Sequence, residues 1–255
     1  MLRESKYELI IGDVNVTLPE KARERPFNLI IADPPFGIKF NKSSHEYGAE
    51  EYDLYQDEFT PELYFEFSKK WIETCYSALV DNGSMYIISG WTNLRPILNA
   101  VDKSKFQTLN HAIWQFSWGV FTKKRFVTSH YHILLLVKDK KRYQFYKQSK
   151  FDEDTFFWPK YNRGNDPHRI KGHPCQLPVI LLEKLICTSS LPCDLVGDVF
   201  SGSGGTILAA RLNNRDVIGF EIRKEYEVII HEKARFGKPV SSFFKQTTLE
   251  SYLSD

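Results

Sequence analysis

Apolar residues along the chain fall into short runs of strand type that alternate with segments of helical spacing. Runs bounded by turn residues predict strands. The predicted strands are Tyr7–Gly12, Asn28–Ala32, Ser84–Ser89, His111–Phe116, His130–Val137, Leu195–Phe200 and Asp216–Ile222. Apolar positions three and four apart predict helices. The predicted helices are the segment after Thr60, Thr92–Val101, Pro178–Ser189, Gly205–Asn213 and Lys224–Arg235. This alternation predicts an α/β protein with a largely parallel sheet.

The first of these helices has clear start signals. Thr60 is a favourable N-cap, and Pro61 suits the first helical position. Helical spacing predicts an inward face made of Leu63, Phe67, Cys75 and Leu79. The tripeptide Asp81-Asn82-Gly83 predicts a turn before the next strand.

Residues 139–172 interrupt the alternation because they mix basic and aromatic residues without clear periodicity. We interpret them as an insertion. It divides one domain into two halves, residues 1–138 and 173–237, and is followed by an uninformative tail, residues 238–255.

The composition allows one sizeable core, since the chain has 255 residues of which 42% are hydrophobic. No apolar run approaches the roughly 20 residues that span a bilayer, and the first residues lack the pattern of a signal peptide. We therefore expect a cytoplasmic protein with no membrane partner. The four cysteines form no CxxC pair and no Cys/His set with zinc spacing, so we expect reduced thiols and no metal site.

Charge is distributed unevenly along the chain. Between Phe121 and Lys171 there are thirteen Lys/Arg and five Asp/Glu residues, a local net charge of +8 in a chain of net charge +2. The remainder is therefore acidic, with a net charge of −6. One basic region on an acidic body indicates a site for a polyanion.

A glycine-rich turn follows the predicted strand that ends near Asp198. Here Phe200 and Ser201 lead into Gly202-Ser203-Gly204-Gly205-Thr206, which opens a helix. Glycine allows a positive φ and a close approach of backbone to ligand, and a helix N-terminus attracts anions. Glu221, at the end of the next strand, occupies the place where a ribose diol is usually held. The spacing is not GxGxxG, so a tight turn without a ligand stays an alternative.

The second motif is Asp33-Pro34-Pro35-Phe36, which ends a buried strand. The Asp33 carboxylate and the Pro34 carbonyl accept hydrogen bonds, and Phe36 offers a face for a planar base. Taken alone, the tetrapeptide also fits a turn with a buried phenylalanine.

Together these motifs resemble those of the DNA amino-methyltransferases, which combine a D/N/S-P-P-Y/F tetrapeptide with an F-x-G-x-G turn. The tetrapeptide comes first and the basic, aromatic segment lies between the motifs, as in the permuted beta class. The resemblance includes Gly12-Asp13 and His173-Pro174 and extends to about Arg235. It implies a Rossmann-like methyltransferase fold that uses S-adenosylmethionine, with a doubly wound, circularly permuted sheet and a small DNA-recognition insertion at residues 139–172.

The resemblance also implies roles for matching residues. Asp33, Pro34, Pro35 and Phe36 would grip a flipped base, with Asp33 also close to the cofactor. The cofactor-binding residues would be Asp13, His173, Pro174, Asp198, Phe200, Gly202, Ser203, Gly204, Thr206 and Glu221. Two departures concern the contacts to the cofactor carboxylate: Leu177 precedes Pro178 where the family often has lysine, and Gly205 intervenes before Thr206.

The implied activity is N6-adenine methylation of double-stranded DNA by base flipping and direct displacement. Lys123, Lys124, Arg125, Arg163 and Arg169 are the candidate DNA-contacting residues, although charge runs are usually solvated surface. A cognate restriction endonuclease is a further candidate partner. We expect a monomer or homodimer of prokaryotic or phage type.

Several alternatives stay open. N4-cytosine methylation is one, although that branch generally has serine in place of Asp33. An RNA guanine methyltransferase can carry the same tetrapeptide, but there the glycine turn normally comes first. In a Rossmann oxidoreductase the Asp-Pro-Pro-Phe tetrapeptide would have no function. The presence of Asp33, Phe200 and Glu221 disfavours a DNA-binding module without catalytic activity. Carbon-5 cytosine methylation needs an activated cysteine, and neither Pro-Cys dipeptide lies near residue 33 in sequence.

Overall fold

The computed structural model describes residues 4–35, 60–117, 119, 121–158, 165–173 and 175–237. Within these ranges eight strands form one sheet, in the order β1-β8-β7-β2-β3-β5-β4-β6. The strands are β1 (Tyr7–Ile11), β2 (Phe27–Ala32), β3 (Leu79–Ser89), β4 (Gln107–Gln115), β5 (His130–Val137), β6 (Thr155–Phe157), β7 (Leu195–Asp198) and β8 (Asp216–Glu221). The helices are α1 (Val14–Glu24), α2 (Pro61–Ala78), α3 (Trp91–Lys103), α4 (Val179–Ser189), α5 (Gly205–Leu212) and α6 (Glu227–Ala234), with a 3-10 turn at Lys224–Tyr226.

Strands β1, β8, β7, β2 and β3 are mutually parallel, and β5 pairs antiparallel with both β3 and β4. The chain leaves β7 through α5 for β8 on one side, and leaves β2 through α2 for β3 on the other. The neighbouring strands β7 and β2 therefore form a switch point, where open α/β sheets bind ligands. This arrangement confirms the predicted doubly wound, mostly parallel fold.

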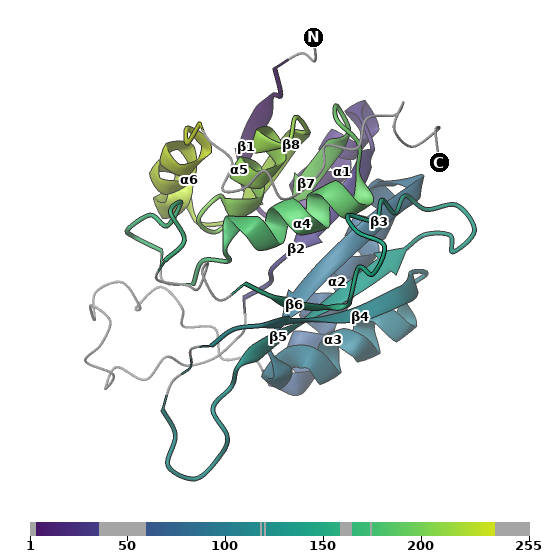
Figure 1. Ribbon diagram of the computed structural model, residues 1–255. Coiled ribbons are helices and arrows are strands. Elements are labelled where there is room, and N and C mark those ends of the chain that lie inside the picture. Colours follow the sequence, from purple (N-terminus) through teal and green to yellow (C-terminus); the bar gives the residue numbers. More distant parts are fainter. Residues whose placement is uncertain are drawn as a thin grey trace.

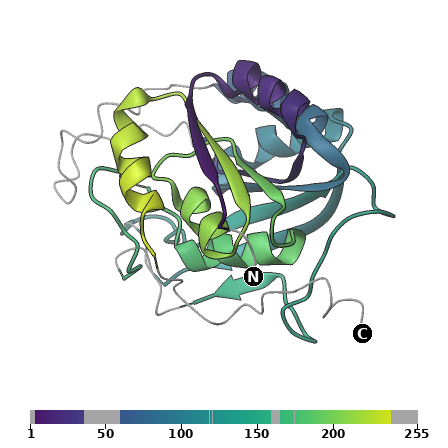
Figure 2. The same cartoon turned by 90° about the horizontal axis from the view of Figure 1, so that it is seen from above.

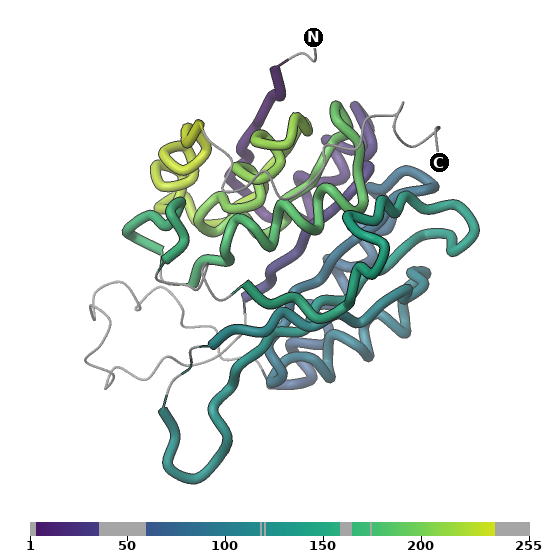
Figure 3. The backbone as a smooth tube through the Cα atoms, in the orientation of Figure 1, coloured from purple at the N-terminus to yellow at the C-terminus, as the bar shows by residue number. Residues whose placement is uncertain are grey.

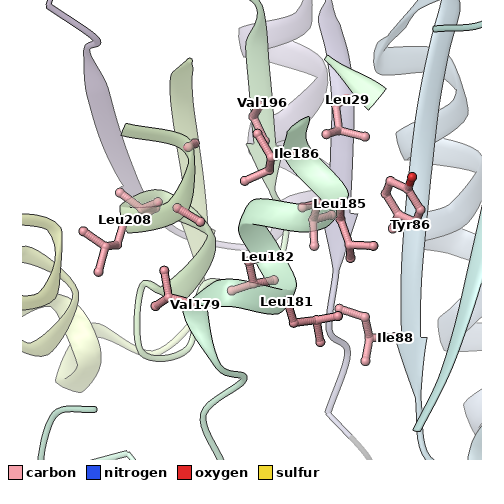
Figure 4. Packing of buried hydrophobic residues seen from close by; sticks show 14 of the residues in the cluster. Leu29, Tyr86, Ile88, Val179, Leu181, Leu182, Leu185, Ile186, Val196 and Leu208 are labelled. Carbon is pink, nitrogen blue, oxygen red and sulfur yellow. The ribbon is translucent and has the colours of Figure 1, made fainter. Parts of the chain in front are cut away.

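Helices cover both faces of the sheet (Figures 1 and 2). On one face α1, α2 and α3 pack over a buried cluster that includes Trp71 and Ile97. On the other face α4, α5 and α6 cover a second cluster. Figure 4 shows Leu185 and Ile186 of α4 beside Leu29 and Val196 of the central strands. No helix in the described ranges is long and apolar enough to cross a membrane.

Helix α2 begins as predicted, because Thr60 Oγ1 accepts a hydrogen bond from the Leu63 backbone N–H. The predicted inward face is partly wrong. Leu63 is 56% exposed, and the buried stripe begins with Tyr64 and continues through Trp71 and Cys75. Successive residues of a helix point about 100° apart, so a prediction that starts the buried face at Leu63 and not at Tyr64 includes a residue that faces solvent.

The turn predicted at Asp81-Asn82-Gly83 is also wrong, because β3 runs from Leu79 through these residues to Ser89. Leu79 pairs with Phe27 and Ser84 pairs with Leu29, so β3 has extra residues between the two pairs. The turn-forming residues are accommodated as this irregularity inside the strand.

Part of the 139–172 segment packs into the domain. Residues 155–157 form the edge strand β6, which was not predicted, and the Tyr146 backbone N–H donates to the Thr188 carbonyl on α4. Asp152 pairs with the buried Lys184 of α4, and Phe156 and Trp158 pack against the α4 side of the core. A recognition role for 139–172 stays a prediction.

Candidate active site

A pocket opens at the switch point, beside the carboxyl ends of the parallel strands. Its wall contains most of the predicted site residues: Asp13, Asp33, Pro34, Pro35, His173, Phe200, Gly202, Ser203, Thr206 and Glu221. Residues 33–35 and 200–206, far apart in sequence, therefore share one cavity. Phe36 and Pro174 lie outside the described residues.

The glycine turn has the geometry that its sequence predicts. Gly202 and Gly204 have φ values of 48° and 81°, in the left-handed region that favours glycine. A Cβ atom at Gly204 would lie 3.2 Å from the Ile230 Cα, so α6 packs directly behind the turn. Gly204 is also the N-cap of α5, which directs the helix N-terminus toward the cavity.

Glu221 holds this turn in place from the end of β8. Its Oε2 accepts the Gly202 backbone N–H at 2.8 Å, and its Oε1 accepts the Arg223 N–H at 2.9 Å. The Gly12 N–H donates to the Glu221 carbonyl, which links the ends of β1 and β8. Asp13 then caps α1 by accepting the Asn15 N–H at 2.8 Å.

The Asp33-Pro34-Pro35 segment leaves β2 beside this turn. The Tyr64 hydroxyl of α2 donates to the Pro35 carbonyl at 2.8 Å, which fixes the segment from the helix side. Asp33 Oδ1 is buried and has no hydrogen-bond partner in the described part of the chain. Burial raises the pKa of Asp33 to about 7.

Asp198 lies behind the pocket wall and is 2% exposed. Burial and the nearby Glu221 and Asp33 carboxylates raise its pKa to about 8. Gly204 likewise lies behind the wall. Three carboxyl groups thus meet at one end of the cavity, an arrangement that a bound cation stabilises.

Phe200 rests on aromatic side chains of α2. Its ring centroid is 5.3 Å from that of Trp71, edge to face, and 6.1 Å from that of Phe67. The sequence analysis placed Phe67 on the inward face of this helix but did not predict that Tyr64 and Trp71 support the site from behind. It also missed wall residues beside known motifs, among them Asn15, Cys175, Ile222, Arg223 and Tyr226.

His173 stacks edge to face on Tyr226, with ring centroids 4.8 Å apart. Burial and the nearby Lys233 ammonium lower the His173 pKa to about 4, so the imidazole is neutral at pH 7. Within the described ranges, no group of three or more His, Cys, Asp or Glu residues is arranged to hold a metal ion.

The candidate DNA-contacting residues fall in separate places. Lys123, Lys124 and Arg125 are exposed on the β4–β5 connection, which extends beyond the strand ends (Figure 3). Arg169 is half-buried near the start of α4, and Arg163 lies outside the described residues. Because β5 reverses direction, the β4–β5 connection leaves the sheet edge that also carries Asp33.

A carboxylate-rich pocket at the switch point of a doubly wound sheet defines an α/β enzyme of the class that binds nucleotide-like cofactors. Residues 27–232 match the model of a family described as DNA methylase, of N6/N4 type, and the chain belongs to this family.

Curated relatives include the type II methyltransferase M.HpaI of Haemophilus parainfluenzae, 28% identical over 225 residues that cover 82% of this chain and 68% of that protein. The DNA adenine methyltransferase YhdJ of Escherichia coli (strain K12) is 28% identical over 246 residues, 86% of this chain and 79% of that protein. Among solved structures, the cytosine-N4-specific PvuII DNA methyltransferase has a TM-score of 0.71 at 18% identity and covers 93% of this chain and 89% of that one. The M1.HpyAVI–SAM complex has a TM-score of 0.64 at 21% identity, and the match covers 90% of this chain and 100% of that one. At these identities the structures establish the shared fold.

Proposed function

We propose that this DNA methylase transfers the methyl group of S-adenosylmethionine to the N6 amine of adenine in double-stranded DNA, at a specific site. The observation that carries the proposal is that Asp33-Pro34-Pro35 and the glycine turn share one pocket. Its relative YhdJ, a DNA adenine methyltransferase, supports a DNA substrate and adenine as the target base.

The pocket residues fit this cofactor. Its sulfonium and ammonium groups are cationic, and they complement a cavity end with three carboxyl groups and a buried, unpaired Asp33 Oδ1. Glu221 would accept hydrogen bonds from the ribose hydroxyls, and Asp13, also on the pocket wall, would lie near the cofactor adenine. The exposed Ile222 side chain, next to Glu221, offers an apolar face for a planar ring.

The chain's own contribution to transfer is to hold and orient the amine. A duplex hides this amine in a base pair, so the base must first swing out, at a cost of a few kcal/mol. Asp33 and the Pro34 carbonyl would then accept hydrogen bonds from its two N–H groups, which directs the nitrogen lone pair at the methyl carbon that the cofactor would supply. The N–C bond would form as the S–C bond breaks and S-adenosylhomocysteine leaves, and the amine would lose one proton, for which the Asp33 carboxylate is a suitable acceptor. Positioning and charge placement provide the rate, and no covalent nucleophile is required.

Transfer of a labelled methyl group to genomic DNA, followed by nucleoside analysis, tests the proposal. We expect label in N6-methyldeoxyadenosine. Label in N4-methyldeoxycytidine would identify the other branch of the family, and absence of label from the DNA would refute a DNA substrate.

We propose that the tip of the β4–β5 connection, the exposed segment from Lys123 to Phe126, contacts the DNA backbone. It carries three basic residues and the fully exposed Phe126, at 99%, and it leaves the same sheet edge as the pocket.

Reversal of charge at Lys123, Lys124 and Arg125, each to Glu, is expected to weaken DNA binding. It should also lower the slope of log K against log salt by up to about 3, since each phosphate contact contributes about 0.9. Fluorescence anisotropy at several salt concentrations measures both. The control reverses Lys103 and Lys105, two exposed lysines just before β4, at the opposite edge of the sheet. An equal loss of slope in both variants would contradict a specific role for the tip.

A further inference from the structure

Lys233 of α6 is a fully buried lysine beside the glycine turn, with 0% exposure. Its ammonium donates to Gln176 Oε1 at 2.9 Å and to Ser203 Oγ at 3.3 Å. Both partners are neutral, and no carboxylate in the described ranges lies within ion-pair distance, 4.0 Å, of the ammonium. A buried ammonium without a directly paired carboxylate is unfavourable, and burial lowers the pKa of Lys233 to about 8 although the more distant Asp166 carboxylate raises it. The protein thus keeps a costly charge at this point.

The two partners of Lys233 lie in two different segments that contribute residues to the pocket wall. Ser203 lines the cavity as part of the glycine turn. Gln176 donates to the Ile170 and His173 carbonyls, at 2.6 and 2.8 Å, and so ties down the segment that presents His173 to the cavity. Lys233 therefore joins the glycine turn to the His173 segment from behind.

The charge of Lys233 has a chemical counterpart in the cofactor. The carboxylate of S-adenosylmethionine is its anionic group and needs a cation or several N–H and O–H donors. The Ser203 hydroxyl lines the cavity and accepts from the ammonium behind it, so its own hydrogen is free to be donated to a carboxylate in the cavity.

We infer that Lys233 is a positioning residue that recognises the carboxylate of S-adenosylmethionine through Ser203. This inference rests on the proposed function. The ammonium orients the Ser203 hydroxyl, holds the turn against the His173 segment, and supplies the positive charge that the carboxylate compensates.

The test compares S-adenosylmethionine with its decarboxylated analogue, which keeps the sulfonium and adenosine but lacks the carboxylate. Isothermal titration without DNA gives both dissociation constants. Lys233→Met should weaken binding of S-adenosylmethionine at least tenfold and leave binding of the analogue unchanged within threefold. Lys233→Arg, which keeps the charge, should retain most of the affinity for S-adenosylmethionine.

The matched control is Lys138→Met. Lys138 also donates to a neutral group, the Leu79 carbonyl at 2.9 Å, but it follows β5 at the far edge of the sheet. It should change neither constant. Ser203→Ala keeps the inference testable if Lys233→Met fails to fold, because it should produce the same discrimination between the two ligands.

If Lys233→Met weakens the binding of both ligands equally, the role of Lys233 is purely structural and the inference is overturned. Unchanged binding of S-adenosylmethionine in Lys233→Met, or in Ser203→Ala if Lys233→Met does not fold, would also overturn it. Failure of the unsubstituted protein to bind either ligand would instead refute the proposed function.

Discussion

Replacement of Asp33 by alanine is expected to lower the rate of methyl transfer by about 10² to 10³, the usual effect of removing one preorganised polar group from an active site. The substitution removes the carboxylate that we propose accepts a hydrogen bond from the target amine, whereas the glycine turn and Glu221 are left in place. Single-turnover transfer to DNA gives the rate, and isothermal titration should show that S-adenosylmethionine still binds.

Tyr64→Phe is the graded control for this prediction. It removes only the hydroxyl that donates to the Pro35 carbonyl, so the segment stays in place but is less firmly held. We expect a smaller loss of rate, about tenfold, with unchanged cofactor affinity. An Asp33→Ala variant that retains full activity would remove this residue from the mechanism.

Cofactor affinity is expected to rise with pH between about 6 and 7.5. In the free protein the Asp33 and Asp198 carboxyls have pKa values of about 7 and 8 and are largely protonated at pH 6. The cationic cofactor favours their ionised forms, so binding releases protons at low pH. Each carboxyl group that ionises when the cofactor binds can raise the cofactor affinity by up to about tenfold per pH unit. Titration in buffers of different ionisation enthalpy counts the released protons.

Asp198→Asn should flatten this pH profile and reduce the proton release. It should also change stability in the absence of cofactor. Because the folded-state pKa of Asp198 is raised, the native protein binds more protons than the unfolded chain above pH 4, and stability falls as pH rises through 8. Urea unfolding at pH 5.5 and 8.5 should show a smaller fall in the variant. An unchanged fall would mean that Asp198 does not titrate in this range.

Much of the sheet could be predicted because each strand carries its own signal. His130–Val137 was predicted with its observed bounds, and the glycine turn and Asp33-Pro34-Pro35 were placed at strand ends that do meet in one pocket. Helix α1 was not predicted: Pro19 lies inside it, and its buried residues are Val14 and Leu18.

The supporting contacts could not be predicted because they depend on tertiary packing. Nothing in the spacing of Tyr64 indicates that its hydroxyl reaches Pro35, and nothing in α6 indicates that Lys233 reaches Ser203 across 30 positions. The basic and aromatic composition of residues 139–158 predicts a surface insertion, but several side chains of this segment pack against α4.

The bond between Glu221 and the Gly202 N–H has a kinetic consequence. The glycine turn, which we propose binds the cofactor, is already held in place in the protein alone, so little conformational entropy is lost when the cofactor binds. We therefore expect the enzyme to load S-adenosylmethionine before it meets DNA, and to search the duplex in the charged, transfer-ready form.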